Sequence, residues 1–155
     1  MSSLSFQSHN HKRCQKFALE QAKTICESQG ERFTPLRKTV FEFVWLSHEP
    51  MKAYELLSKL QAVHPSSAPP TVYRALNFLQ SLGLVHKIES LNAYLGCSVP
   101  GAAHSCQFLI CRSCGSVAEL ENSNIDNTIE ELTDSLGFDY ESMTMEIHGI
   151  CSQCR

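Results

Sequence analysis

Two cysteine pairs with the same spacing set the strongest limit on how this chain folds. Cys111 and Cys114 form the first Cys-x-x-Cys pair, Cys151 and Cys154 form the second, and 36 residues separate the pairs. Four thiolates spaced in this way can surround one zinc ion tetrahedrally. Such a site would join the two ends of a long segment and restrict its unfolded state. The alternatives are disulfides or a redox pair, but a redox Cys-x-x-Cys normally follows a strand and opens a helix, and these pairs lie at turns or near the chain end.

The composition indicates a globular protein in a reducing compartment. Of the 155 residues, 43% are hydrophobic and 19% are charged, which suits one ordinary domain or two small ones. No apolar run approaches the ~20 residues of a membrane helix. The first residues, Met1-Ser2-Ser3-Leu4, do not resemble a signal segment. We therefore expect a cytoplasmic protein without membrane association, in which the eight cysteines are more often metal ligands than disulfide partners.

The net charge of −3 conceals a division along the chain. Residues 1–90 contain eleven Lys and Arg against seven Asp and Glu, a net charge of +4. Residues 91–155 contain two Lys and Arg against nine Asp and Glu, a net charge of −7. A basic half followed by an acidic half indicates two modules, and the first could approach a polyanion such as nucleic acid. Charge alone does not distinguish this interpretation from ordinary variation in surface charge.

Four helices and a β-hairpin are expected in the first half of the chain. Apolar residues recur at helical spacing in three successive segments, and Thr34 and Pro35 are predicted to open the second of them, with Thr34 as its capping residue. A loop over residues 66–70 contains Pro69 and Pro70, which break any helix before them. Thr71 is predicted to begin a fourth helix, and two short strands follow within residues 84–97. This order of elements is typical of a winged helix-turn-helix.

The fourth helix presents polar side chains on the side opposite its apolar face. Tyr73, Arg74 and Asn77 lie on this outward side. The N-terminal residues of a recognition helix reach base edges in the major groove, where Arg suits guanine and Asn suits adenine. An ordinary surface helix is the alternative, but the hairpin that follows carries Lys87, as a wing along a DNA backbone would. The pattern therefore favours DNA binding.

The second half predicts a strand–strand–helix–strand order over residues 107–147. One helix covers only one face of such a small sheet, so we expect a second copy to cover more of it in a homodimer. The predicted fold class is α+β. It consists of a winged-helix DNA-binding domain over residues 1–91, a hinge over residues 92–105, and a small α/β dimerisation domain with an antiparallel sheet over residues 106–155.

A second set of potential metal ligands is spread over both modules. It comprises His86, Cys97, His104 and Glu119. Each alone has an ordinary explanation as a polar residue. Together, one sulfur, two nitrogens and one oxygen would suit zinc, and the thiolate disfavours magnesium and manganese. A metal ion held by all four residues would clamp the two modules at one angle.

Several motifs together resemble the ferric uptake regulator family. They are Thr34-Pro35-Leu36-Arg37, Pro70-Thr71-Val72-Tyr73-Arg74-Ala75-Leu76, the His86-Lys87-Ile88-Glu89 strand and both cysteine pairs. The resemblance runs from about residue 15 to the C-terminus. Cys97 stands where iron sensors of the family have oxygen and nitrogen ligands, so the chain is similar to the zinc uptake regulator branch.

The resemblance implies a homodimeric bacterial repressor that binds a palindromic, AT-rich operator near zinc-uptake genes. It implies a structural zinc ion at Cys111, Cys114, Cys151 and Cys154, and a regulatory zinc ion at His86, Cys97, His104 and Glu119, hence two zinc ions per monomer. It assigns operator contacts to Tyr73 and Arg74. Together with the outward-facing and motif residues, the expected DNA-binding set is Thr71, Tyr73, Arg74, Asn77, Arg37 and Lys87.

Other functions stay open on the sequence alone, although we predict that the chain is not an enzyme. An iron- or manganese-responsive regulator would share the fold, but Cys97 argues against it. A peroxide sensor would need an iron site with His and Asp ligands, which the chain does not supply. A zinc-containing thiol-redox enzyme would need an open zinc position or a reactive cysteine pair, whereas four thiolates saturate the first site. The sequence does not determine the operator, the metal affinity, the controlled genes, the number of dimers per operator, or the roles of Cys106 and His148.

Overall fold

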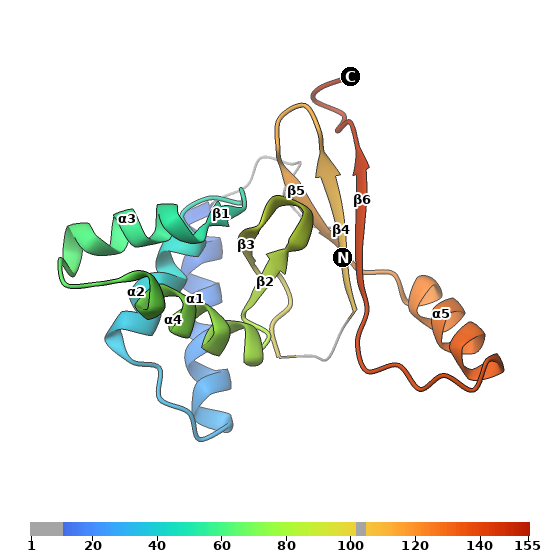
Figure 1. Cartoon of the computed structure of the whole chain (residues 1–155), viewed down its shortest axis with the longest axis horizontal. Helices are drawn as coiled ribbons and strands as arrows, with labels where there is room; N and C mark the ends of the chain where they lie inside the picture. Colours follow the sequence, from blue (N-terminus) through green and yellow to red (C-terminus); the bar gives the residue numbers. More distant parts are fainter. Residues whose placement is uncertain (1–10, 102–104) are drawn as a thin grey trace. The chain divides into compact units, whose positions relative to one another are not determined.

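The computed structural model describes residues 11–101 and 105–155, which divide into two compact units. Residues 11–101 form the helical unit and residues 105–155 form the sheet unit (Figure 1). The described residues contain five α-helices and six β-strands, which confirms the predicted α+β class. No helix within these residues is both long and apolar enough to span a membrane.

Four helices build the helical unit: α1 (His11–Ser28), α2 (Pro35–Val44), α3 (Ala53–Val63) and α4 (Pro69–Ser81). Their apolar faces meet in one core, because residues three and four apart share a helix face. The core residues with no exposed surface are Ala22, Val40, Val44, Leu56, Leu60, Leu76 and Leu79. This packing holds α4 against α2 and α3 and leaves the opposite face of α4 exposed.

Helices α2 and α4 both begin with proline. Thr34 precedes α2, and its hydroxyl accepts a hydrogen bond from the Arg37 amide at 3.4 Å, as predicted for a capping residue. Helix α4 starts at Pro69, two residues before the predicted start at Thr71. The first amides of a helix have no intrahelical acceptor, so Pro69 and Pro70 cost no hydrogen bond there.

Three short strands form the wing of the helical unit: β1 (Met51–Lys52), β2 (Val85–Ile88) and β3 (Ala93–Gly96). They pair antiparallel in the order β1-β3-β2. The 3-10 turn η2 (Glu89–Leu91) and Asn92, with a φ of 46°, reverse the chain between β2 and β3. The predicted hairpin is confirmed. Strand β1 is not predicted, because two residues are too few to show an alternating pattern.

The sheet unit contains β4 (Cys106–Cys111), β5 (Val117–Leu120), α5 (Ser123–Ser135) and β6 (Thr144–Gly149), with the strand order β5-β4-β6. Strand β5 is antiparallel to β4, as predicted. Strand β6 instead runs parallel to β4, so the sheet is mixed and not wholly antiparallel. The physical reason is the α5 crossover, which carries the chain past β4 and returns it along the other edge in the direction of β4.

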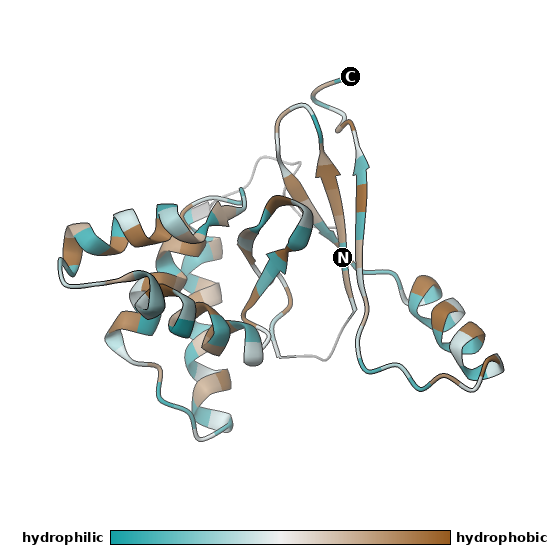
Figure 2. Cartoon of the chain, viewed as in Figure 1, coloured by the Kyte–Doolittle hydropathy of each residue, from teal (hydrophilic) through white to brown (hydrophobic). Residues whose placement is uncertain are grey.

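Helix α5 packs little of its surface against the rest of the sheet unit. None of its residues is buried, and Leu132 and the C-cap residue Leu136 are 56% and 81% exposed. Figure 2 shows this apolar stripe along a helix that stands off from the three strands. The start of α5 is held to β4 by Asp126, which accepts a hydrogen bond from Gln107 Nε2 at 2.8 Å and another from the Ser105 hydroxyl. The predicted amphipathic helix is therefore present, with its apolar face uncovered in the single chain.

Candidate metal centres and nucleic-acid interface

The parallel pairing of β4 and β6 brings the two cysteine pairs together. Cys111 ends β4 directly opposite Gly149, the last residue of β6, so the turns that follow these strands lie side by side. The four Sγ atoms of the two pairs all lie within 4.8 Å of one another. All four residues of the predicted first site, Cys111, Cys114, Cys151 and Cys154, therefore converge.

The sulfur separations fit a tetrahedral zinc site. Cys114 Sγ and Cys151 Sγ are 3.8 Å apart. Four Zn–S bonds of about 2.3 Å at tetrahedral angles separate neighbouring sulfur atoms by about 3.8 Å. A disulfide would hold them at about 2.0 Å. All eight cysteines are free thiols, so the alternative of two disulfides does not apply to this structure.

The ionisation of these thiols also fits a cation. Backbone amides, first that of Cys151 at 3.4 Å, lower the pKa of Cys111 to about 6. A hydrogen bond with Ser113 lowers the pKa of Cys154, but the neighbouring thiols, Cys151 first, outweigh it and raise that pKa to about 12. Four thiolates at these distances repel one another. Full ionisation therefore needs a bound positive charge, which a zinc ion supplies.

Two serines beside the thiols were missed by the sequence analysis. The Ser116 hydroxyl lies 3.2 Å from Cys114 Sγ and lowers the pKa of that thiol. Ser113 makes the hydrogen bond to Cys154 described above. Their position within a Cys-x-x-Cys pair or two residues after it is the signal that could have indicated them, since hydrogen bonds from such residues stabilise a thiolate.

A second candidate metal site begins in the helical unit with His86 and Cys97. His86 lies on β2 and Cys97 directly follows β3, so the hairpin brings them together. Their ligand atoms lie within 4.8 Å of each other, and both side chains are buried. The Cys97 amide donates to the Leu84 carbonyl at 3.0 Å, which extends the hairpin pairing to the cysteine. A thiolate and an imidazole are donors that suit zinc.

The other two predicted ligands of this site belong to the second part of the chain. Glu119 lies on β5 of the sheet unit, where it is buried and pairs with Phe108 in the strand register. His104 lies outside the described residues. The complete four-residue set, His86, Cys97, His104 and Glu119, therefore stays a prediction.

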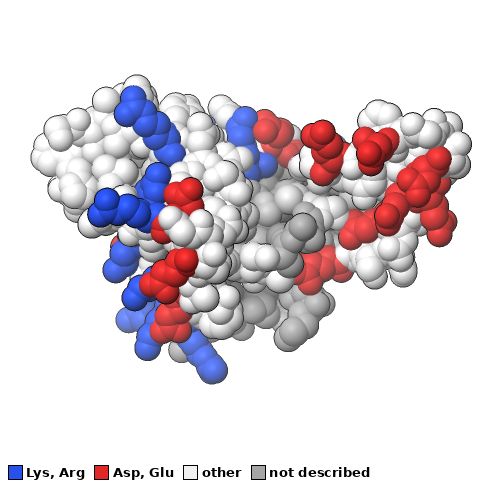
Figure 3. Space-filling model, turned by 90° about the horizontal axis from the view of Figure 1, so that it is seen from below, with Lys and Arg blue, Asp and Glu red and all other residues white. Residues whose placement is uncertain are grey.

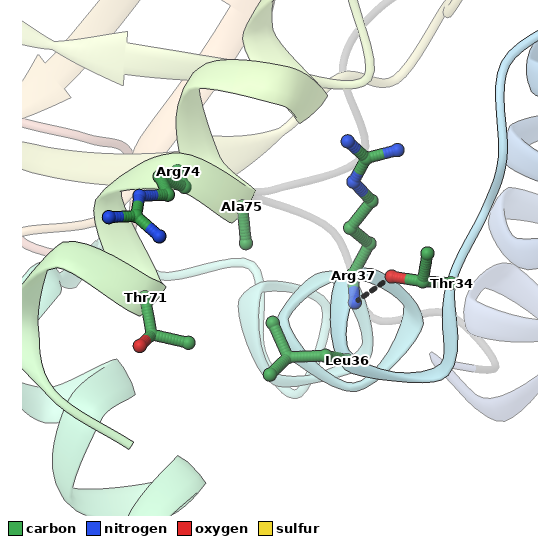
Figure 4. A pocket seen from close by; sticks show the side chains of 6 residues that line it. All are labelled: Thr34, Leu36, Arg37, Thr71, Arg74 and Ala75. Carbon is green, nitrogen blue, oxygen red and sulfur yellow. Dashed lines mark hydrogen bonds between the residues drawn. The ribbon is translucent and has the colours of Figure 1, made fainter.

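The outward face of α4 carries the residues predicted to read DNA. Tyr73 is 47% exposed, and Arg74 and Asn77 are also exposed. A pocket of about 160 Å³ lies between the starts of α2 and α4. Figure 4 shows Thr71 and Arg74 of α4 on one side of this pocket. Its full lining is Thr34, Leu36, Arg37, Thr71, Arg74 and Ala75.

Two of the predicted DNA contacts have partners within the chain. The Arg37 guanidinium stacks over the Phe78 ring, 3.4 Å from its centroid, and donates to the Arg32 carbonyl at 2.6 Å. Lys87 Nζ lies 2.7 Å from a Glu89 carboxylate oxygen, and this hydrogen bond raises the pKa of Lys87. A phosphate would have to compete with these partners for both cations. The exposed Arg74 is better placed for base contacts.

Charge is distributed over the units as the sequence predicts. Lys and Arg side chains gather over the helical unit, whereas Asp and Glu side chains cover α5 (Figure 3). The acidic residues of α5 are Asp126, Glu130, Glu131 and Asp134. The helical unit is therefore the part of the chain suited to a nucleic acid.

A winged helix with an exposed polar recognition face, joined to a sheet unit with four converging thiols, defines the chain as a winged-helix metalloprotein. The family model described as the ferric uptake regulator family matches residues 28–148, and the chain belongs to that family. This confirms the predicted family. Its members are transcription regulators, so the alternative of a thiol-redox enzyme is excluded.

The relatives that match include several zinc regulators. The zinc uptake regulation protein of Escherichia coli K12 is 37% identical over 137 residues, which cover 88% of this chain and 80% of that protein. A solved zinc uptake regulator in complex with zinc and DNA is 36% identical, with a TM-score of 0.86 over 90% of this chain and 94% of that one. The holo form of a regulator named XcZur is 42% identical, with a TM-score of 0.81 over 90% and 97% of the two chains. Its apo form has a TM-score of 0.51 over 92% of this chain and 98% of that one.

Proposed function

We propose that this chain is a zinc-responsive transcriptional repressor that binds a palindromic operator as a homodimer in the cytoplasm and controls zinc-uptake genes. The observation that carries the proposal is the buried pair of His86 and Cys97 in the same unit as the recognition helix. A thiolate–imidazole pair favours zinc over manganese, because thiolates select softer metals. An iron- or manganese-responsive regulator is therefore the weaker candidate.

The proposal includes two zinc ions per monomer. The structural ion would be held by Cys111, Cys114, Cys151 and Cys154. The regulatory ion would be held by His86, Cys97, His104 and Glu119. The first set is supported by the convergence of its four Sγ atoms and the second by the proximity and burial of its first two members.

The regulatory ion would act by changing which arrangements of the chain are populated. Its proposed ligands come from both units, so binding would favour the arrangements in which those ligands meet. The hinge that we propose over residues 92–105 includes β3, which is paired in the wing, so bending would occur after Gly96. The holo form of XcZur has a higher TM-score against this chain than the apo form has. The structure of that relative therefore differs between its two forms.

The dimer would form through the sheet unit, proposed to span residues 106–155. The uncovered apolar stripe of α5 is the surface that supports a second copy, because contiguous exposed apolar surface commonly marks a protein–protein interface. Two winged-helix units, proposed to span residues 1–91, would then read the two halves of a palindrome. The proposed DNA-contacting residues are Thr71, Tyr73, Arg74, Asn77, Arg37 and Lys87.

A metal-titrated DNA-binding assay tests this function. Duplexes selected from a random library with zinc present serve as the probe, and fluorescence anisotropy measures binding as zinc, manganese or iron(II) is added. Zinc should promote binding most strongly, and Cys97→Ser should abolish the response while keeping the structural zinc. Cys14→Ser is the matched control, because Cys14 lies on α1 outside both thiol sites. Equal responses of the parent and Cys97→Ser would refute the proposal.

A further inference from the structure

Gly96, the last residue of β3, lies so close to the indole of Trp45 that no side chain fits there. A Cβ atom at position 96 would lie 2.3 Å from both Cε2 and Nε1 of Trp45 and 2.8 Å from its Cζ2. Real Cβ atoms do not approach other atoms within 3.0 Å. Gly96 does not have a positive φ, so the neighbouring ring requires the glycine and the backbone conformation does not.

The indole itself is held in place on several sides. Its ring centroid lies 6.1 Å from that of Phe41 and 5.9 Å from that of His48, and the residue is 6% exposed. The Trp45 carbonyl accepts a hydrogen bond from Gln15 Nε2 at 2.5 Å, which ties α1 to the end of α2. Trp45 therefore forms a rigid surface against the end of the wing.

Hydrogen bonding does not explain why a tryptophan occupies this position. The indole Nε1 is buried and has no hydrogen-bond acceptor among the residues that the structure describes. A buried donor without an acceptor costs about 1–3 kcal/mol. The shape of the ring is the property left to account for the residue, and besides Phe41 and His48 the ring lies against Gly96.

This contact lies one residue before a proposed zinc ligand. Gly96 pairs with Val85 and Leu95 pairs with His86, so the end of β3 sets where Cys97 stands relative to His86. Zinc–ligand distances are tolerated only within about 0.2 Å. We infer that Trp45 and Gly96 form a steric stop that positions Cys97 beside His86 for zinc. The inference rests on the proposed function, and Trp45 acts as a positioning residue without being a ligand.

Zinc titration of the full chain against a fluorescent chelator tests the steric stop. Gly96→Ala should lower the affinity of the second zinc ion at least tenfold without releasing the first. Trp45→Phe replaces the indole by a smaller phenyl ring that lacks the Cε2–Nε1–Cζ2 edge facing Gly96, so the double variant Trp45→Phe/Gly96→Ala should regain affinity to within threefold of the parent. Gly30→Ala is the control, because it lies outside both thiol sites and a Cβ there meets nothing within 4 Å, while its positive φ disfavours alanine and so tests for a general loss of stability without a clash. An unchanged affinity in Gly96→Ala, or a double variant as weak as Gly96→Ala, would overturn the inference.

Two further measurements keep this test separate from the proposed function. If Cys97→Ser binds the second zinc ion like the parent, the proposed regulatory site fails, and the steric stop is then judged in metal-free protein. There, the Cys97 amide, which donates to Leu84, should exchange with solvent faster in Gly96→Ala and recover in the double variant. Unchanged exchange would overturn the steric stop. If Gly96→Ala does not fold, recovery of folding in the double variant supports the steric stop and its absence overturns it.

Discussion

Replacing Cys151 with serine should unfold the sheet unit and leave the helical unit folded. The reason is the small apolar core of the sheet unit. Its buried apolar residues are Phe108, Ile110, Cys111, Val117 and Ala118, and α5 contributes none. The core of the helical unit draws on all four of its helices. Because its apolar core is the smaller of the two, the sheet unit depends on its proposed zinc ion for a larger part of its stability.

The magnitudes support this expectation. A unit of 51 residues is stable by about 3–8 kcal/mol at the usual ~0.05–0.15 kcal/mol per residue. Structural zinc in zinc-finger peptides contributes about 10–16 kcal/mol at pH 7. If the ion is lost together with its fourth ligand, the loss exceeds the whole stability expected of the unit, so unfolding and not partial weakening is the predicted outcome.

Hydrogen exchange read by mass spectrometry, with zinc content measured in parallel, checks this prediction. In Cys151→Ser, peptides from β4, β5 and β6 should exchange at the rates of an unfolded chain. Peptides from α1 to α4 should change less than threefold. Cys106→Ser is the control in the same unit, because Cys106 lies outside the four-thiol cluster. Sheet peptides that stay protected in zinc-free Cys151→Ser would refute the reasoning.

Three further predictions concern DNA binding, α5 and pH. Arg74→Ala should weaken binding to a selected duplex by about 1–3 kcal/mol, with little effect on random duplex in the same anisotropy assay. Asp126→Ala leaves the buried Gln107 amide with only its longer hydrogen bond, at 3.4 Å to the Ser105 hydroxyl, and should lower the free energy of unfolding by about 0.5–1.5 kcal/mol in urea melts, whereas exposed Glu130→Ala should not. Because the pKa of Cys111 is about 6, that thiol is already ionised above pH 6 in zinc-free protein and takes up a proton below it. Below pH 6, zinc binding at the four-thiol site should therefore release one additional proton per zinc ion, so zinc affinity should fall more steeply as the pH is lowered. An unchanged slope of zinc affinity against pH in chelator competition would contradict the low pKa of Cys111.

Local patterns in the sequence were enough to predict most elements of the fold. The helical periodicities, the Thr34 cap and the hairpin are each determined by residues close together in the chain, and the structure confirms them. The four-thiol site was also predictable, because Cys-x-x-Cys spacing by itself restricts the geometry of two sulfur atoms. The exact start of α4 was not predictable from the sequence, since proline is tolerated in the first turn of a helix as well as in a loop.

The tertiary structure decided the features that depend on contacts between distant segments. The parallel register of β4 and β6 places the two cysteine turns together, and no local pattern distinguishes it from antiparallel pairing. The closeness of His86 to Cys97 depends on the hairpin, and the fit of Trp45 against Gly96 joins residues 51 positions apart. Spacing along the chain encodes local geometry, because backbone dihedrals are local. Which surfaces meet is decided only when the whole core packs, because that packing is a property of all its side chains at once.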